Sequence, residues 1–327
     1  MEVLLSIVLP IYNVSRYLDD CMKTIIGKNE DLVEILLIDD GSTDDSGKIA
    51  DSYAVCNKNV KTYHKKNGGL SDARNYGLLR AKGKYVFFLD SDDFVKDEMI
   101  DILVEVLSTK KLEVLLWDAD IYDQYGNRMK VDSSYYHHMG VAENVLCTGQ
   151  KVIESQLAYR NDYVTTVWLG LYNRDFLINN NFWFEKDLLH EDEMWTQKVL
   201  IEAKKVMYIN SGLYCYRMRE NSIMRQVDKD YTRNIAALIY IHSSLLSYYD
   251  WKVIDDNFKK KLKGNTVKRY LHMIGKYQVY RYHDLAKRIN RRQLFLNATE
   301  KKDKIRSLLL MVNIQVYCIV VRYLKMH

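Results

Sequence analysis

The sequence predicts an α/β fold with a mostly parallel sheet, followed by a helical C-terminal region. Short apolar runs recur through the first hundred residues, and stretches with the spacing of amphipathic helices separate them. Beyond about residue 228 the strand-like runs fade and only helix-like patterns continue. Buried strands that alternate with helices at this interval are typical of βα units and a parallel sheet.

The first hundred residues contain four expected strands and three expected helices. The apolar runs that predict strands are Leu4–Leu9, Val33–Ile38, Val60–Tyr63 and Tyr85–Leu89. The stretches that predict helices are Ser15–Ile26, Ser42–Val55 and Ser71–Ala81. Each helix lies between two strands, which is the order that parallel pairing requires.

The next part of the chain predicts further strands and helices with a long irregular segment among them. Residues 99–107 and Glu191–Ala203 have helix patterns, and 113–123 reads as one strand. The polar stretch 124–147 is expected to be a loop or hairpin region, and 166–180 a strand followed by a short helix. Val206–Ile209 and Leu213–Tyr216 are expected to form a strand pair.

The C-terminal hundred residues predict helices alone. Their helix-like segments are Tyr231–Tyr249, Phe258–Tyr277, Tyr282–Phe295 and Lys304–Leu324. We therefore expect an α/β domain at 1–225, made of the halves 1–100 and 101–225. Residues 226–327 would form a basic helical region that ends in an apolar helix.

Charge is divided unevenly along the chain. Residues 1–251 hold 29 Lys and Arg against 38 Asp and Glu, whereas residues 252–306 hold 17 against 5. Such asymmetry indicates regions with different partners. The five cysteines are scattered and lack metal-type spacing, and the apolar N-terminus has no basic segment, so we expect a reduced cytoplasmic chain without a signal peptide.

Polar side chains follow three of the expected strands. Tyr12 follows the first strand, Asp39 and Asp40 the second, and the acidic run 90–93 the fourth. Ligands of open α/β sheets bind beyond the carboxyl ends of the strands, so these residues are expected at one edge. Clustered carboxylates suit a hard cation such as Mg²⁺ or Mn²⁺, although helix capping explains an Asp-rich turn equally well.

Two further stretches carry groups that could contact a nucleotide. In "IDDGSTDDS", Asp40 begins a good turn and cap, but a carboxylate there could also accept a hydrogen bond from a base ring N–H. In "NGGLSDAR", a glycine pair precedes a helix that carries Arg74, and this combination can bind an anion. The dinucleotide fingerprint G-x-G-x-x-G follows none of the strands, which argues against an NAD enzyme.

Taken together, these stretches resemble family 2 inverting glycosyltransferases with the GT-A fold, particularly bacterial capsule and exopolysaccharide enzymes. The resemblance is carried by "SIVLPIYN" (6–13), "IDDGSTDDS" (38–46), "NGGLSDARNYGL" (67–78) and "FLDSDD" (88–93). "LLHEDEMWT" (188–196) and "YRMRENSI" (216–223) look like later motifs of that family. Together, these motifs in the family's order are highly specific. The resemblance implies that 1–225 is a catalytic domain, with a nucleotide-sugar-binding half at 1–100 and an acceptor half at 101–225.

The resemblance implies a role for individual residues. Pro10, Tyr12 and Asp40 would line the base pocket with Asp39 beside them, and Arg74 would lie near the base or diphosphate. Asp90 and Asp92 match the family's D-x-D, so Asp92 would hold Mn²⁺ or Mg²⁺ and Asp90 would contact ribose or metal. Asp192 matches the catalytic base, with Glu191 beside it. Arg217, Arg219 and Ser222 would belong to a loop over the diphosphate.

These residue types suit transfer of a hexose or N-acetylhexosamine from a nucleotide-diphosphate sugar, expected to be UDP-linked. A bound cation stabilises the departing nucleoside diphosphate, and a carboxylate can take the acceptor's proton. Acidic residues also favour helix starts, so "HEDE" alone would not identify a base. The competing interpretations are a non-catalytic sugar-nucleotide-binding protein and a sugar nucleotidyltransferase, which would usually carry a glycine-rich basic loop after its first strand.

The sequence of the C-terminal region is compatible with more than one binding partner. Nucleic acid is not expected, because no nucleic-acid motif accompanies the basic helices. The apolar stretch 307–324 only reaches the lower range for spanning a bilayer. An interfacial helix beside a basic patch would hold the chain at the inner face of the bacterial membrane, near a lipid-linked glycan acceptor. Packing on the protein itself, or in a homodimer, is the alternative.

Overall fold

The computed structural model describes residues 2–219 and 230–325. The chain divides into two compact units, one within Met1–Asp187 and Trp195–Gln226 and the other within Leu188–Met194 and Val227–His327. Each unit is described by itself below.

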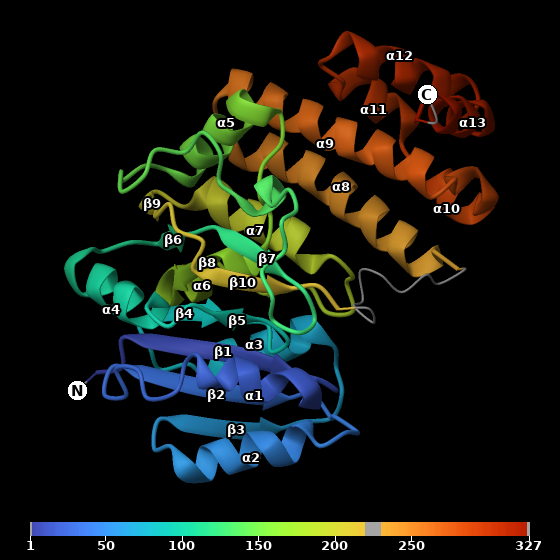
Figure 1. The fold of residues 1–327 in the computed structure, drawn as a ribbon. Helices are drawn as coiled ribbons and strands as arrows, with labels where there is room; N and C mark the ends of the chain where they lie inside the picture. Colours follow the sequence, from blue (N-terminus) through green and yellow to red (C-terminus); the bar gives the residue numbers. More distant parts are fainter. Residues whose placement is uncertain (1, 220–229, 326–327) are drawn as a thin grey trace. The chain divides into compact units, whose positions relative to one another are not determined.

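The first unit is built on a seven-stranded, mostly parallel sheet with the strand order β3-β2-β1-β4-β8-β6-β9 (Figure 1). Its strands are β1 (Leu5–Ile11), β2 (Val33–Asp39), β3 (Val60–His64), β4 (Tyr85–Phe88), β6 (Val114–Leu116), β8 (Gly170–Asn173) and β9 (Val206–Tyr208). The first four strands pair in parallel, and β8 runs antiparallel to both of its neighbours. The predicted α/β class with its parallel N-terminal strands is confirmed.

Helices cover this sheet because every residue of its central strands β1, β2 and β4 is buried. The helices are α1 (Ser15–Lys23), α2 (Ser46–Cys56), α3 (Leu70–Arg80), α4 (Met99–Thr109), α5 (Gly149–Arg160), α6 (Arg174–Asn179) and α7 (Glu191–Glu202). The first turn of α7, up to Met194, belongs to the second unit and the rest of the helix, from Trp195, to the first, so this helix contributes residues to both units. α3 packs directly on β1 and β2, where Gly77 lies against Val8.

A smaller three-stranded sheet corrects two sequence expectations. It has the order β5-β10-β7, from β5 (Phe94–Val95), β7 (Ala119–Tyr122) and β10 (Tyr214–Arg217). Residues 113–123 therefore form two strands in different sheets, separated at Trp117 and Asp118. The expected pair at 206–216 is divided in the same way, because β9 joins the large sheet while β10 joins the small one.

The register of the large sheet brings the strand ends together. Ile11 at the end of β1 is paired with Asp39 at the end of β2, and the backbone N–H of Asp40 donates to the Ile11 carbonyl at 2.8 Å. Val8 is paired with Phe88 at the end of β4. The polar residues that follow these three strands consequently lie along one edge of the sheet.

The second unit is helical in its described part. It contains α8 (Thr232–Lys252), α9 (Asp256–Lys276), α10 (His283–Arg288), α11 (Arg291–Asn297), α12 (Lys301–Val312) and α13 (Ile314–Lys325). The segment expected as one helix at 282–295 is two helices broken at Ile289, and the segment at 304–324 is broken at Asn313. Within the described residues, no helix is long and apolar enough to cross a membrane.

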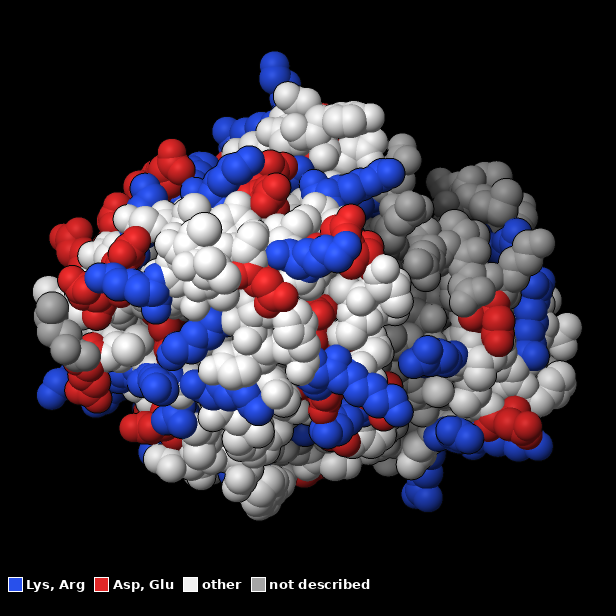
Figure 2. Space-filling model, turned by 90° about the horizontal axis from the view of Figure 1, so that it is seen from below, with Lys and Arg blue, Asp and Glu red and all other residues white. Residues whose placement is uncertain are grey.

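Charged side chains are mixed on the face that Figure 2 shows, which is the molecule seen from below Figure 1. Lys and Arg lie among Asp and Glu there, and uncharged residues separate them. A continuous field of one sign, such as a nucleic acid requires, is not seen among the coloured residues of this face. All five cysteines are free thiols.

Candidate functional site

The candidate site begins at the turn that follows β4, where Asp90, Ser91, Asp92 and Asp93 stand. The Ser91 hydroxyl donates to the carbonyl oxygen of Pro10 at 2.6 Å, which fixes this turn to the end of β1. Asp90 and Asp92 keep about a fifth of their side-chain surface exposed, whereas Asp93 is buried. Tyr12, just beyond β1, is half exposed and leaves a ring face available at the same edge.

Asp40 is buried and holds the glycine turn before α3. Its two carboxylate oxygens accept hydrogen bonds from the backbone N–H groups of Gly68 and Gly69, at 2.9 and 2.8 Å. Lys65 forms an ion pair with the same carboxylate. The contact of Asp40 with a nucleotide base stays a prediction. Beyond these protein contacts, the Asp40 carboxylate has further lone pairs that can accept hydrogen bonds.

Asp39 is held by a second set of contacts at the end of β2. Its carboxylate accepts from the Ser42 backbone N–H at 2.9 Å and pairs with the His64 Nδ1 at 2.8 Å. Burial alone would raise the pKa of Asp39, but the hydrogen bonds from His64 and Ser42 lower it below its usual value. His64 also contacts Asp51, and both carboxylates raise the pKa of His64.

Arg74 connects α3 to the acidic turn. Its guanidinium donates to Asp90 at 2.7 Å and lies over the Phe184 ring, with 5.4 Å from the guanidinium carbon to the ring centroid. The side chain is almost fully buried. Arg74, predicted to lie near the base or diphosphate, and Asp90, predicted to contact ribose or metal, are therefore in direct contact.

Arg219 forms the corresponding contact with Asp92. The distance between the Arg219 guanidinium nitrogen and the Asp92 carboxylate is 2.6 Å. Burial raises the pKa of Asp92, the Arg219 charge opposes that rise, and repulsion from Asp90 adds to it. A raised pKa in spite of an arginine partner indicates a carboxylate whose charge another cation would stabilise.

Asp93 is the residue of the turn that sequence reasoning missed. It accepts hydrogen bonds from the Tyr214 hydroxyl and from the Arg217 backbone N–H, both at 2.7 Å. Burial, with repulsion from Asp92 and Asp90, raises the pKa of Asp93 well above its usual value. Its partners lie more than 120 residues further along the chain, so no local pattern could have indicated that Asp93 joins β10 to the acidic turn.

Arg217 is buried rather than free at the loop where it was expected. Its guanidinium contacts Asp20 and the Gln124 carbonyl oxygen, each at 3.2 Å. The guanidinium carbon also lies 5.2 Å from the Tyr17 ring centroid and 5.0 Å from that of Phe94. These contacts hold β10 against α1 and β5, so its predicted contact with the diphosphate would have to be made from within this packing.

The predicted base lies in the second unit. Asp192 and Glu191 are in the first turn of α7, where the Asp192 carboxylate accepts from the Glu193 backbone N–H at 3.0 Å. His190, just before the helix, has a left-handed φ of 59° and its Nε2 lies 3.4 Å from the Asn234 amide nitrogen. Ser222, expected in the diphosphate loop, lies outside the described residues.

The donor atoms fit a divalent cation only in part. Among the described residues, no three His, Cys, Asp or Glu side chains are grouped to hold a metal ion. Asp90 and Asp92 nevertheless offer two partly exposed carboxylates on one turn. Mg²⁺ is commonly held by one or two carboxylates together with substrate phosphates, so this pair suits a cation that arrives with a diphosphate.

Residues 6–179 match the family described as "Glycosyl transferase family 2". Over 319 residues the chain is 30% identical to "Glycosyltransferase GlyG" of Streptococcus pneumoniae, an alignment that covers 93% of this chain and 100% of GlyG.

Solved structures show the same fold at lower identity. Residues 1–349 of S. aureus TarS, in complex with UDP-GlcNAc, superpose with a TM-score of 0.70 at 17% identity, covering 97% of this chain and 89% of that one. The mannosyltransferase PcManGT from Pyrobaculum calidifontis, in complex with GDP-Man and Mn²⁺, gives 0.55 at 14% identity, covering 98% and 86%. The fold is the GT-A fold, and the chain belongs to glycosyl transferase family 2.

Proposed function

We propose that this chain is an inverting, metal-dependent glycosyltransferase that moves a hexose or N-acetylhexosamine from a UDP-linked donor to a glycan. The observation that carries the proposal is the pair Asp90 and Asp92, partly exposed at the sheet edge and each paired with an arginine. The UDP-GlcNAc complex of TarS supports a UDP-linked donor.

The nucleotide would lie along the ends of β1 and β2. Tyr12 would stack on the base, beside Pro10 at the end of the same strand. Asp39 and Asp40 are held rigidly by backbone N–H groups, and a rigid carboxylate selects a base N–H at a low entropy cost. Arg74 would reach the diphosphate from α3 and Arg219 from the chain after β10, and Arg217 would contact it from within its packing against α1 and β5.

Asp92, with Asp90 beside it, would hold Mn²⁺ or Mg²⁺ against the diphosphate. When bound, the cation stabilises the negative charge that develops on the leaving nucleoside diphosphate. The Mn²⁺ and GDP-Man complex of PcManGT supports this assignment. Arg219 forms an ion pair with the Asp92 carboxylate. When a cation binds Asp92, the Arg219 guanidinium would therefore turn toward the diphosphate.

Asp192 would act as the catalytic base, with Glu191 as its neighbour. A carboxylate that takes the acceptor hydroxyl proton on the face opposite the leaving group gives inversion at the anomeric carbon. General base catalysis of this kind contributes roughly 10²–10⁴-fold. The Glu193 backbone N–H donates to the Asp192 carboxylate and so orients it at the start of α7.

The acceptor would be a lipid-linked glycan in the synthesis of a surface polysaccharide, such as capsule or exopolysaccharide. We propose that the protein works in the cytoplasm, peripherally at the inner face of the bacterial membrane. The basic stretch 252–306 and the apolar side chains exposed on α12 and α13 support this location. A homodimer through the same helices is the alternative arrangement.

A transfer assay tests the function directly. The protein is incubated with Mn²⁺, a panel of UDP-, GDP- and TDP-sugars and candidate glycan acceptors, and nucleoside diphosphate release is followed. We expect UDP release with one sugar, a product of inverted anomeric configuration by NMR, and a loss of roughly 10²–10⁴-fold in Asp192→Asn. The matched variant Glu193→Gln should keep most of the activity.

Two other results would replace the proposal with one of its competitors. Donor binding without turnover on any acceptor would identify a non-catalytic sugar-nucleotide-binding protein. Formation of a sugar nucleotide with release of pyrophosphate would identify a nucleotidyltransferase.

A further inference from the structure

The second unit contains a pocket whose described lining has no acidic residue. The cavity has a volume of about 560 Å³ and is formed by the turn before α10, α10 itself, the start of α11 and the junction of α12 with α13. Its lining residues are Tyr280, Arg281, His283, Ala286, Lys287, Arg291, Asn313, Ile314 and Gln315. A concave site with several cations and amide groups is suited to a phosphate group.

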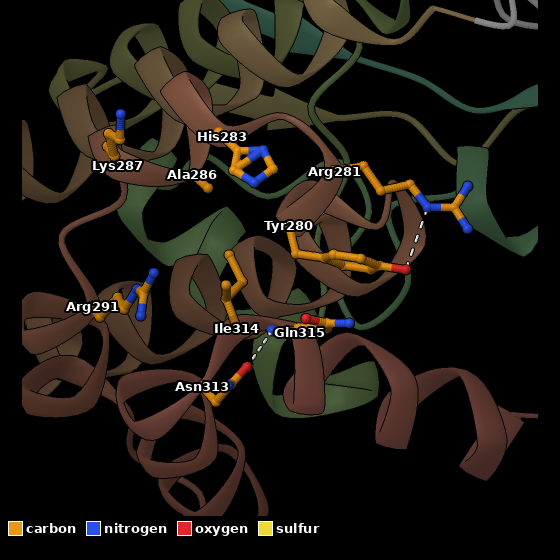
Figure 3. A pocket seen from close by; sticks show the side chains of 9 residues that line it. All are labelled: Tyr280, Arg281, His283, Ala286, Lys287, Arg291, Asn313, Ile314 and Gln315. Carbon is orange, nitrogen blue, oxygen red and sulfur yellow. Dashed lines mark hydrogen bonds between the residues drawn. The ribbon is translucent and has the colours of Figure 1, made fainter.

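Figure 3 shows how these side chains are arranged. His283 and Ile314 point into the space between α10 and the start of α13, and Arg291 lies along its side. Arg281 and Lys287 extend outward from the rim. The pocket therefore offers Arg291 at its side for one phosphate. Arg281 and Lys287 at its rim are available for negative charges around that phosphate.

The cations of the pocket are only weakly engaged by the protein. Within the described chain, Arg281 and Arg291 make no ion pair, and their closest polar partners are the Tyr280 hydroxyl at 3.3 Å and the Leu310 carbonyl oxygen at 3.5 Å. Lys287 pairs with Asp284 at 3.2 Å, but both side chains are more than three-quarters exposed. An exposed pair of this kind contributes little and leaves the ammonium able to bind another anion.

An apolar face continues directly from the pocket. Tyr317, Cys318 and Val321 of α13 are buried, and Tyr317 and Cys318 hydrogen-bond to carbonyl groups of α9. Because residues three and four apart share one face of a helix, the exposed side chains of α13 lie on the opposite face. The apolar ones among them are Val316, Ile319 and Val320, and the polar Gln315 and Arg322 are exposed as well.

The preceding helix extends this face. Ile305, Leu308 and Val312 of α12 are exposed, while Ser307 and Leu310 on its other side are buried. Val312 and Val316 flank Asn313, Ile314 and Gln315, which line the pocket. The same five-residue stretch thus contributes to the basic pocket and, at both of its ends, to the apolar surface.

We propose that this surface docks on an anionic phospholipid bilayer, with one lipid phosphate in the pocket and the exposed side chains of α12 and α13 among the acyl chains. This proposal gives a molecular basis for the membrane location proposed above. It rests on the proposed function for that location alone. Apolar insertion and attraction to anionic headgroups add at an interface.

Vesicle co-sedimentation of the full chain tests the proposal. Vesicles of phosphatidylcholine alone are compared with vesicles that also contain phosphatidylglycerol. We expect binding only to the anionic vesicles, and a loss of roughly 30-fold in the partition coefficient for the double variant Arg281→Gln with Arg291→Gln. The matched variant Arg288→Gln with Arg292→Gln removes the same charge from exposed positions outside the pocket and should lose less than about 5-fold.

The apolar contribution has its own pair of variants. Val316→Ser with Ile319→Ser should lower the partition coefficient by roughly 10-fold or more, whereas Val55→Ser with Leu79→Ser, two exposed residues of α2 and α3, should leave it unchanged. UDP binding and thermal unfolding, measured on every variant, show that each is folded and keep this test separate from the catalytic proposal.

Four results would overturn the proposal. Equal binding to both kinds of vesicle would show that the surface does not recognise anionic lipid. Equal losses for the two arginine pairs would show that the pocket binds no lipid headgroup of its own. Saturable binding of inorganic phosphate with no vesicle binding would indicate a site for a free anion. Conversion of a dimer into a monomer by the Val316 and Ile319 substitutions, without a change in vesicle binding, would assign the apolar face to a second copy of the chain.

Discussion

The acidic side chains at the sheet edge have two different tasks. Asp40 and Asp93 are buried and accept hydrogen bonds from backbone N–H groups, which fixes the glycine turn and β10 in place. Asp90 and Asp92 remain partly exposed and are balanced by arginines. Asp40 and Asp93 therefore fix the backbone of the site. We propose that Asp40 also contacts the base, and that Asp90 and Asp92 meet the diphosphate and its cation.

The contact between Tyr214 and Asp93 leads to a prediction for stability. Tyr214→Phe removes the hydroxyl that donates to a buried carboxylate, so the free energy of unfolding should fall by about 1–3 kcal/mol. Urea unfolding measures this change. Tyr125→Phe, at a ring that is 80% exposed, should alter the stability by less than about 0.5 kcal/mol. Equal stability of the two variants would show that Asp93 does not depend on this donor.

Arg219 leads to a prediction for metal binding. Because its guanidinium pairs with Asp92, it competes with a cation for the same carboxylate. Arg219→Ala should bind Mn²⁺ roughly 3- to 10-fold more tightly than the wild type when no nucleotide is present. Calorimetry measures the affinity, with Arg16→Ala as an exposed control of equal charge. An unchanged Mn²⁺ affinity in Arg219→Ala would indicate that Asp92 does not bind the metal.

His64 leads to a prediction for pH dependence. Its pKa is raised by Asp39 and Asp51, so its stabilising effect is complete below the ordinary histidine pKa of about 6.5 and is lost as the pH rises through the raised value. The lowered pKa of Asp39 has the opposite sign, and that contribution is lost only as the pH falls below about 4.

His64 is about half exposed, so solvent screening limits the effect to less than about 1 kcal/mol. His64→Gln should flatten the stability profile between about pH 6 and pH 9, as followed by urea unfolding. His283→Gln, at an exposed histidine without an ion pair in the described chain, should leave the profile unchanged. A profile that is equally steep in His64→Gln and the wild type would contradict the assignment.

At the scale of elements, the position of α3 depends on a glycine. A Cβ atom on Gly77 would lie 2.3 Å from Val8 Cγ1, so a larger residue would push the helix away from β1. Gly77→Ala should lower the free energy of unfolding by about 1–3 kcal/mol although alanine is the better helix former. It should also weaken UDP binding, because α3 carries Arg74 and begins at the glycine turn.

Leu79→Ala is the control for Gly77→Ala, since Leu79 is 62% exposed on the same helix. Its effect on stability should stay within about 0.5 kcal/mol. A Gly77→Ala variant that is as stable as the wild type and binds UDP as well would show that α3 does not need this close contact.

The elements also show what sequence patterns can predict. The first four strands were placed within two residues because β1, β2 and β4 are fully buried, mostly apolar runs, and β3 begins at a buried valine. Residues 113–123 read as one strand because both sheets bury apolar side chains there, and the division at Trp117 depends on tertiary partners. The helix α5 was missed because its apolar residues do not keep a clear helical period.

Breaks between helices were equally hard to predict. The segment 304–324 is apolar on both sides of Asn313, whose extended backbone separates α12 from α13. The Asn313 side chain accepts hydrogen bonds from the backbone N–H groups of Gln315 and Val316 and so begins the second helix. Asparagine is a common N-cap, and this signal could have indicated the break within the apolar stretch.

At the scale of the whole molecule, the sequence predicted the donor-side residues better than the acceptor side. Parallel strands necessarily bring their carboxyl ends to one edge, so residues 39, 40, 90 and 92 could be grouped without coordinates. Asp192 follows no strand of the sheet, and the segment Leu188–Met194 that contains it belongs to the second unit. Its role rests on the family's motif and stays a prediction until the Asp192→Asn variant is assayed.

The central claim is that Asp92 binds a divalent cation together with the diphosphate of a UDP-linked donor. Titration calorimetry of UDP, with and without Mn²⁺, tests it on the wild type, on Asp92→Asn and on the exposed control Asp97→Asn. We predict that Mn²⁺ tightens UDP binding by roughly 10-fold or more in the wild type and in Asp97→Asn, and that Asp92→Asn loses this gain. Equal UDP affinity with and without Mn²⁺ in the wild type, or a full gain retained by Asp92→Asn, would contradict the account.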